Sequence, residues 1–182
     1  MPLPKGLPTP SNPSASGTTF YGSATINAPA SIVWQKLLDF SDYTSNTFTP
    51  VVEFPSLSSH PLQPGDQGSL DAYVGANDES ARPTKVQITL VDEKNHKFGW
   101  KGLGLPTWAL RPERVQEVVD LGDGRCEYRT WETMGGPGAM VVNWMMGTKL
   151  DKTNKRCGGD LKRMVEEGNV APESCMVTAV GR

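Results

Sequence analysis

Apolar and polar positions alternate most clearly along residues 114–134, on both sides of a Gly122-Asp123-Gly124 turn. Alternation with a period of two predicts a pair of antiparallel strands. Glycine at 124 suits the positive φ that a three-residue loop with a G1-type bulge requires. We therefore expect a β-hairpin in which Leu121 lies opposite Arg125.

The register of this hairpin decides which side chains share a face of the sheet. One face then carries four cross-strand pairs: Arg114–Glu132, Gln116–Thr130, Val118–Tyr128 and Asp120–Cys126. The opposite face carries three: Val115–Trp131, Glu117–Arg129 and Val119–Glu127. We expect Trp131 to be half exposed there. A simple two-residue loop would instead pair Arg114 with Thr133 and change both faces.

The chain before the hairpin predicts one early helix among short strands. The strands are expected at Phe20–Ile26, Val51–Phe54, Gly68–Val74, Thr84–Val91 and Lys97–Lys101. The helix is expected at Ser31–Phe40, after Pro29, and a second short helix or turn from Ser41 to just before Pro50. The apolar stripe of the first helix would consist of Ile32, Val33, Trp34, Leu37 and Phe40.

After the hairpin, the glycines and proline at 135–138 break the chain, and Ala139–Met146 is a short apolar run. Helical spacing then predicts a long helix from Gly147 to Glu167. This helix is long enough to cover one face of an antiparallel sheet, which indicates an α+β fold. The pair Gly158-Gly159 costs helix stability, about 1 kcal/mol per glycine, which favours a close approach to the sheet or a space beneath the helix.

Composition places the chain among single-domain globular proteins. It has 182 residues, a net charge of −2 and no apolar run long enough to span a membrane. We expect a cytoplasmic protein, a monomer or weak homodimer, that binds no nucleic acid and has no electrostatic reason to bind an anionic membrane. Its folded domain would cover residues 19–168, between a flexible proline-rich tail at 1–18 and a polar tail at 169–182.

Several segments resemble the SRPBCC or START-like superfamily, in particular its polyketide cyclase/dehydrase-like branch. They are residues 24–30 with Val33-Trp34 and 38–40, the turn 121–125, Glu132 followed by Gly135-Gly136, and Leu161-Lys162-Arg163. The resemblance implies a helix-grip fold: a curved antiparallel sheet wrapped around a long C-terminal helix, with two short helices after the first strand. It also implies an apolar cavity between sheet and helix that holds a hydrophobic small molecule.

The chain departs from many members of this superfamily at two places. Residues 45–48 replace a Trp-Asn-Pro motif, and Arg114 stands where a histidine is common. Functions that depend on that histidine therefore do not transfer. The chain's own two histidines, His60 and His96, lie in polar loops and are poor candidates for a catalytic base, and no metal-ligand spacing or cofactor motif is present.

The polar face of the hairpin is the best candidate for chemistry. Arg114 would polarise a ligand carbonyl, Glu132 would move a proton, and Tyr128 would donate to an enolate or phenolate. The simpler interpretation is a cross-strand ion pair that only lines a cavity. The candidate substrate-binding residues are Gln116, Thr130, Trp100, Trp108, Trp144, Val118, Met134, Asn154, Cys157 and Leu161, of which Trp108 and Trp144 would cap the cavity mouth.

Two functions remain open on the sequence. One is a cyclase or isomerase without cofactor that acts on a polyketide- or terpenoid-like intermediate held in a reactive conformation. The other is a carrier that binds a lipid, quinone or sterol unchanged. The several polar groups of the hairpin favour the enzyme.

Overall fold

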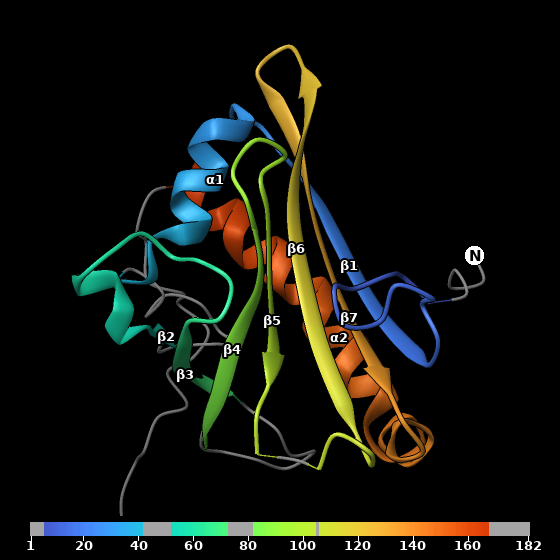
Figure 1. The fold of residues 1–182 in the computed structure, drawn as a ribbon. Coiled ribbons are helices and arrows are strands. Elements are labelled where there is room, and N and C mark those ends of the chain that lie inside the picture. The colour runs from blue at the N-terminus through green and yellow to red at the C-terminus, as the bar shows by residue number, and fades with distance from the viewer. Residues whose placement is uncertain (1–5, 42–51, 73–81, 105, 168–182) are drawn as a thin grey trace, which may run out of the picture.

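The computed structural model describes residues 6–41, 52–72, 82–104 and 106–167. Its strands form one antiparallel sheet in the order β1-β7-β6-β5-β4-β3-β2 (Figure 1). The strands are β1 (Thr18–Ile26), β2 (Val52–Glu53), β3 (Gln67–Ala72), β4 (Arg82–Asp92), β5 (Lys97–Gly102), β6 (Arg111–Gly122) and β7 (Arg125–Gly135). The predicted α+β helix-grip fold is confirmed.

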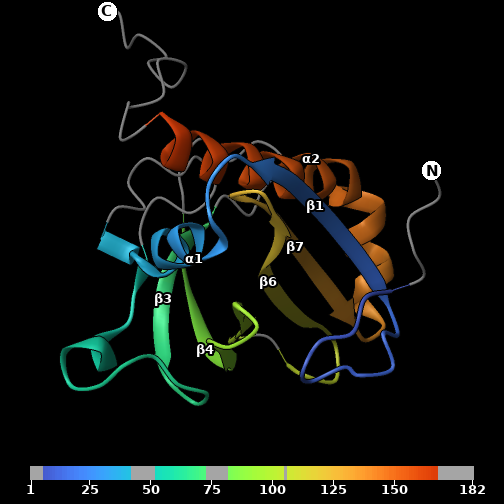
Figure 2. The ribbon, with the colours of Figure 1, turned by 90° about the horizontal axis from the view of Figure 1, so that it is seen from above.

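One long helix, α2 (Gly138–Glu166), runs along one face of the sheet, closest to β1 (Figure 2). We call the face that α2 covers the inner face. None of the helices in the described ranges is long and apolar enough to cross a bilayer. A short helix, α1 (Ala30–Leu38), follows β1, and a 3-10 turn, η2 (Pro55–Ser58), follows β2. The main core lies between the inner face of the sheet and the helices α1 and α2.

Helix α1 begins directly after Pro29, whose fixed φ suits a helix start. It buries Ala30, Val33, Trp34 and Leu37, which recur at the spacing of one helix face. The sequence predicts Ile32 in this stripe, but the residue is 50% exposed and is not among the buried residues of α1. The predicted second short helix and the C-terminal tail at 169–182 lie outside the described residues.

The predicted hairpin register is confirmed along β6 and β7. All seven predicted cross-strand pairs are present: Arg114–Glu132, Val115–Trp131, Gln116–Thr130, Glu117–Arg129, Val118–Tyr128, Val119–Glu127 and Asp120–Cys126. The same pairing continues outward, because Trp100 of β5 lies opposite Arg114 and Phe20 of β1 lies opposite Glu132. Each strand therefore contributes alternate residues to the inner face.

The closing turn of the hairpin differs from the prediction. Gly122, not Leu121, lies opposite Arg125, and Leu121 is the extra residue of a bulge. The loop is reduced to Asp123 and Gly124, whose φ values of 54° and 72° are the two positive values of a type I′ turn. The bulge adds the residue that the shorter loop removes, so the pairing further along the strands is unchanged.

Helix α2 lies unusually close to β1 because glycine is present on both elements. A Cβ on Gly22 would stand 2.1 Å from the backbone oxygen of Asn154, and a Cβ on Gly158 would stand 3.0 Å from the Cβ of Ala24. Gly159, in contrast, is exposed, and a Cβ there would meet nothing within 4 Å. Of the two glycines singled out in the sequence, only Gly158 serves the close approach.

The apolar run Ala139–Met146 is not a separate segment but the first two turns of α2. Ala139 is buried, and Val142 packs with Phe20 and Met134 in a second, smaller core cluster. The side chains between them point to solvent. Because nearly every residue of the run is apolar, its sequence hides the helical period that the structure shows.

Residues 7–12 form an N-terminal strap across the outer face of the sheet, where composition predicts a flexible tail. The indole N–H of Trp131 donates to the Pro8 carbonyl at 3.0 Å, and the Thr133 hydroxyl donates to the Leu7 carbonyl at 2.8 Å. The backbone N–H of Ser11 donates to the buried carboxylate of Glu113 at 2.8 Å. The strap leaves Trp131 buried rather than half exposed.

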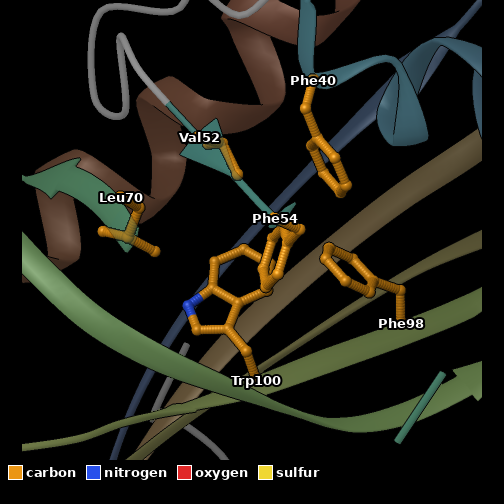
Figure 3. Close-up of a pocket in the computed structure, with 6 residues that line it drawn as sticks. All are labelled: Phe40, Val52, Phe54, Leu70, Phe98 and Trp100. Carbon is orange, nitrogen blue, oxygen red and sulfur yellow. The ribbon is translucent and has the colours of Figure 1, made fainter. Parts of the chain in front are cut away.

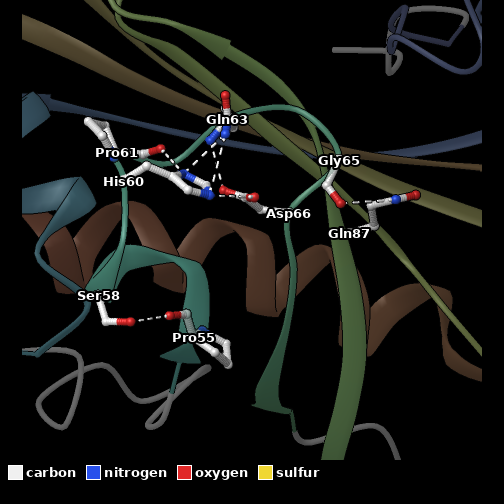
Figure 4. Close-up of polar contacts among 8 residues, drawn as sticks. All are labelled: Pro55, Ser58, His60, Pro61, Gln63, Gly65, Asp66 and Gln87. Carbon is white, nitrogen blue, oxygen red and sulfur yellow. Dashed lines mark hydrogen bonds and ion pairs between the residues drawn. The ribbon is translucent and has the colours of Figure 1, made fainter.

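The loop between η2 and β3 is held by its own polar contacts (Figure 4). Nε2 of Gln63 lies 3.1 Å from Nδ1 of His60, and the carboxylate of Asp66 accepts a hydrogen bond from the backbone N–H of Gln63 at 3.0 Å. The Gln87 side chain donates to the Gly65 carbonyl at 3.2 Å, which fixes the loop against β4. His60 therefore has a structural role in an exposed loop.

Candidate functional site

An ion pair between β6 and β7 forms the centre of the candidate site. Nη2 of Arg114 lies 2.9 Å from Oε2 of Glu132, and both side chains are largely buried on the inner face. Nη1 of Arg114 also approaches Sγ of Cys157 on α2 at 3.6 Å. The guanidinium is thus held where the sheet meets the helix.

The charges of this pair support each other in a dry environment. Burial is the largest single effect and opposes the positive charge of Arg114, but the Glu132 carboxylate together with the smaller contributions of Cys157 and Tyr128 outweighs it, and the pKa of Arg114 is raised. Burial also raises the pKa of the Cys157 thiol, although the charge of Arg114 opposes this shift. The site therefore presents a permanent cation beside a neutral thiol, which gives Cys157 little nucleophilic character.

A second polar group lies next to the ion pair. The Tyr128 hydroxyl donates to Oε1 of Gln116, and both side chains are buried. In the described part of the chain, Nε2 of Gln116 and Oγ1 of Thr130 have no hydrogen-bond partner, nor does Oδ1 of Asn154. Gln116 lies opposite Thr130, and Asn154 sits over Gly22, the other neighbour of Thr130. A buried donor without a partner is costly, so these atoms mark a place for a polar guest.

An aromatic pocket lies on the inner face, at Phe98 and Trp100 of β5 (Figure 3). Its six lining residues are Phe40, Val52, Phe54, Leu70, Phe98 and Trp100. The ring centroids of Phe98 and Trp100 are 4.9 Å apart, and those of Phe40 and Phe54 are 5.3 Å apart. The pocket volume is about 10 Å³, which is room for about one water.

The pocket and the polar groups occupy neighbouring strands. Trp100 is the cross-strand partner of Arg114, and Phe98 is the partner of Gln116. A ligand that entered between the aromatic rings would therefore meet the guanidinium of Arg114 and Nε2 of Gln116 next. None of the six lining residues comes from α2, so the expected cavity between sheet and helix remains a prediction.

The structure brings together some of the predicted site residues and separates others. Arg114, Glu132, Tyr128, Gln116 and Thr130 share the inner face, as the register predicts. The buried core beside them includes Val118, Cys157 and Leu161, and Asn154 joins them through Gly22. Met134 belongs to the second cluster. Trp108 and Trp144 are on the surface and do not line the pocket.

Four pocket residues were not predicted as ligand contacts: Phe40, Val52, Phe54 and Leu70. The sequence shows them as ordinary members of a helix stripe and of short strands, because nothing in the local pattern reports that their side chains meet. Phe40 and Phe54 carry the clearest signal, since each is an aromatic residue at the end of a predicted element. Among the described residues, no cluster of His, Cys, Asp and Glu is suited to a metal ion.

No family model matches the sequence. The chain is, however, 30% identical over 176 residues to oxopyrrolidines biosynthesis cluster protein O of Penicillium oxalicum. The match covers 81% of this chain and 86% of that protein. The chain belongs to the same family as this protein. The chain has the helix-grip fold that its resemblance to the SRPBCC or START-like superfamily implied.

Solved structures with the same fold include proteins of different activity. The Zhui aromatase/cyclase from Streptomyces sp. R1128 matches with a TM-score of 0.58 at 16% identity, over 84% of this chain and 99% of that one. Norcoclaurine synthase from Thalictrum flavum matches with a TM-score of 0.58 at 12% identity, over 82% and 94%. A hypothetical protein from Helicobacter pylori matches with a TM-score of 0.70 at 12% identity, over 91% and 99%. These likenesses show the shared fold.

Proposed function

We propose that the protein is a cofactor-independent cyclase or isomerase that acts on a hydrophobic biosynthetic intermediate. One observation carries the proposal: the Arg114–Glu132 ion pair and Nε2 of Gln116, which has no partner among the described residues, lie on strands next to an aromatic pocket on the same face of the sheet. A site that only shielded an apolar compound would not need a buried cation, a carboxylate and a free donor in one place.

The chemistry follows from where charge would develop. A ligand carbonyl beside Arg114 and Nε2 of Gln116 would accept hydrogen bonds from both, and removal of an adjacent carbon-bound proton would create an enolate that the guanidinium stabilises. Glu132 would accept that proton and return it to the product, so the atoms balance in an isomerisation or ring closure. As the oxyanion forms, it replaces Glu132 as the partner of Arg114.

The aromatic pocket would supply orientation. Packing against Phe98 and Trp100 would hold the apolar part of the ligand in a folded conformation from which ring closure is fast. The pocket has room for about one water. A ligand would therefore enter only when the aromatic side chains that line the pocket change rotamer. Ligand binding is therefore expected to change the fluorescence of Trp100.

The similar proteins support a biosynthetic role. The relative from Penicillium oxalicum is named for the biosynthesis of oxopyrrolidines, and one neighbour in fold is an aromatase/cyclase. Oxopyrrolidines contain a ring carbonyl, which suits the two donors at Arg114 and Gln116. We therefore propose a carbonyl-containing precursor of comparable chemistry as the substrate class.

The proposal is tested by incubating the protein with an organic extract of its source and following compounds by mass spectrometry. A product of equal mass, or of mass less one water, identifies the substrate. Glu132→Gln is then expected to slow conversion by about a hundredfold or more, because it removes the proton acceptor. Arg114→Lys should slow it as well, because a lysine lacks the forked donors.

Glu127→Gln is the matched control for Glu132→Gln. Glu127 lies on the same strand and also forms an ion pair, at 2.6 Å with Arg129, but on the outer face of the sheet. It should leave conversion unchanged. Conversion by Glu132→Gln at the wild-type rate would rule out this catalytic assignment. A compound that is bound tightly but never consumed would favour the alternative function, a carrier. The wholly apolar lining of the pocket is the observation that favours a carrier.

A further inference from the structure

The first two turns of α2 expose an unusual set of large apolar side chains. Trp144 is 85% exposed and Met140 is 78% exposed, with Val141 and Met145 beside them. Single exposed apolar residues are common, but a contiguous group indicates an interaction surface. We call these four residues the apolar tip of α2.

A fifth large side chain lies at the same end of the molecule. Trp108, 75% exposed, belongs to the turn at 106–109, and the Ala109 carbonyl of this turn accepts a hydrogen bond from the N–H of Gly138 at 2.9 Å. The turn is therefore fixed against the start of α2. Neither tryptophan takes part in the pocket or in the core clusters.

The same helix face changes from apolar to basic along its length. Val141 and Lys152, Trp144 and Lys155, and Met145 and Arg156 are each separated by about three helical turns, so each pair points in nearly the same direction. All three basic side chains are exposed. Within this stretch, Asp151 is the acidic neighbour, and it pairs with Lys155 at 2.6 Å.

This arrangement matches the chemistry of a membrane surface with anionic headgroups. Tryptophan and methionine side chains enter the boundary between headgroups and acyl chains, while lysine and arginine attract anionic phosphates. A second copy of the chain seated on the apolar tip would leave the three basic side chains without a role. The net charge of −2 hides this feature, because it averages over the whole chain whereas the basic residues are gathered on one helix face.

We propose that the outer face of α2 docks the protein on the surface of a bilayer that contains anionic lipid. The helix lies in the plane of the surface, its apolar tip is inserted, and Lys152, Lys155 and Arg156 contact the headgroups. This contact is independent of the catalytic proposal, since it uses none of the residues of the inner face.

The test is flotation of the full chain with vesicles of phosphatidylcholine alone and with vesicles that also contain phosphatidylserine. Binding is expected to the second kind only, and to decrease with added salt. Replacement of Met140 and Trp144 by serine should reduce binding about tenfold or more, because it removes the inserted side chains. Replacement of Lys152 and Arg156 by glutamate should reduce it at least as much.

The matched controls are Leu121→Ser and Lys94→Glu, which change an exposed apolar residue at the end of β6 and an exposed basic residue in the turn between β4 and β5. They should bind as the wild type does. Circular dichroism shows whether each variant is folded, and only folded variants are compared. Absence of binding to anionic vesicles overturns the proposal. So does a dimer in light scattering that the Met140/Trp144 variant abolishes, because the apolar tip would then be the interface between two copies.

Discussion

Substitution of Gly22 by alanine is expected to separate α2 from β1. The new methyl group would stand 2.1 Å from the oxygen and 2.4 Å from the carbonyl carbon of Asn154, and 2.9 Å from the backbone nitrogen of Lys155. All three atoms belong to the backbone of a long helix, so no side chain can rotate away. The helix itself must move.

The size of the effect follows from these distances. Ordinary contact between carbon atoms requires about 3.5 Å, so α2 must shift by more than about 1 Å. Overpacking of a core costs roughly 1–3 kcal/mol, and a clash between two backbones belongs at the upper end of this range. For a chain of 182 residues, a loss of about 3 kcal/mol lowers the melting temperature by roughly 6–12 °C.

The measurement is the free energy of unfolding from urea denaturation, together with the melting temperature. Gly159→Ala is the matched control, since that position is exposed and a Cβ there meets nothing within 4 Å. It should stabilise the protein by about 0.5–1 kcal/mol, because alanine favours the helix. If Gly22→Ala proved as stable as the wild type, the close contact between α2 and β1 would not exist as described.

Two further predictions concern the strap and the thiol. Trp131→Phe removes the N–H that holds the Pro8 carbonyl, so a non-specific protease should remove the strap faster while the rest of the domain stays intact; an unchanged cleavage rate would contradict this. The pKa of Cys157 is raised in the folded state, so ionisation of the unfolded thiol above about pH 8.5 should reduce the free energy of unfolding as pH rises. Cys157→Ala should flatten this decline in urea titrations between pH 7 and pH 10, and an identical slope in both proteins would refute the assignment.

The hairpin and its inner face could be predicted because a strand alternates strictly. Once Asp120 and Cys126 are opposite each other, every pair down to Arg114 and Glu132 follows, and the details of the turn no longer matter. The error at Leu121 was harmless for this reason. The residues that share the inner face were therefore accessible from the sequence.

The remaining features depend on contacts between segments far apart in the chain. The strap is held through backbone carbonyls and the backbone N–H of Ser11. Because these groups are present in every residue type, the sequence of the strap carries no periodic pattern that predicts its position. The pocket arises where the ring of Phe40 meets those of Phe54 and Phe98, and no local pattern predicts these contacts. The 85% exposure of Trp144 could not be predicted from the sequence, because an apolar residue type does not by itself decide burial.

The position of β1 at the edge of the sheet has a consequence for synthesis on the ribosome. Its strand partner is β7, and the strap before it binds residues that follow about a hundred positions later. At the usual speed of translation, β1 waits roughly 5–20 s for that partner to emerge. During this time an unpaired strand could join with other nascent chains. The prolines at positions 8, 10 and 13 lie in the segment before it and cannot extend a β-ladder, so they limit such aggregation until the last strand arrives.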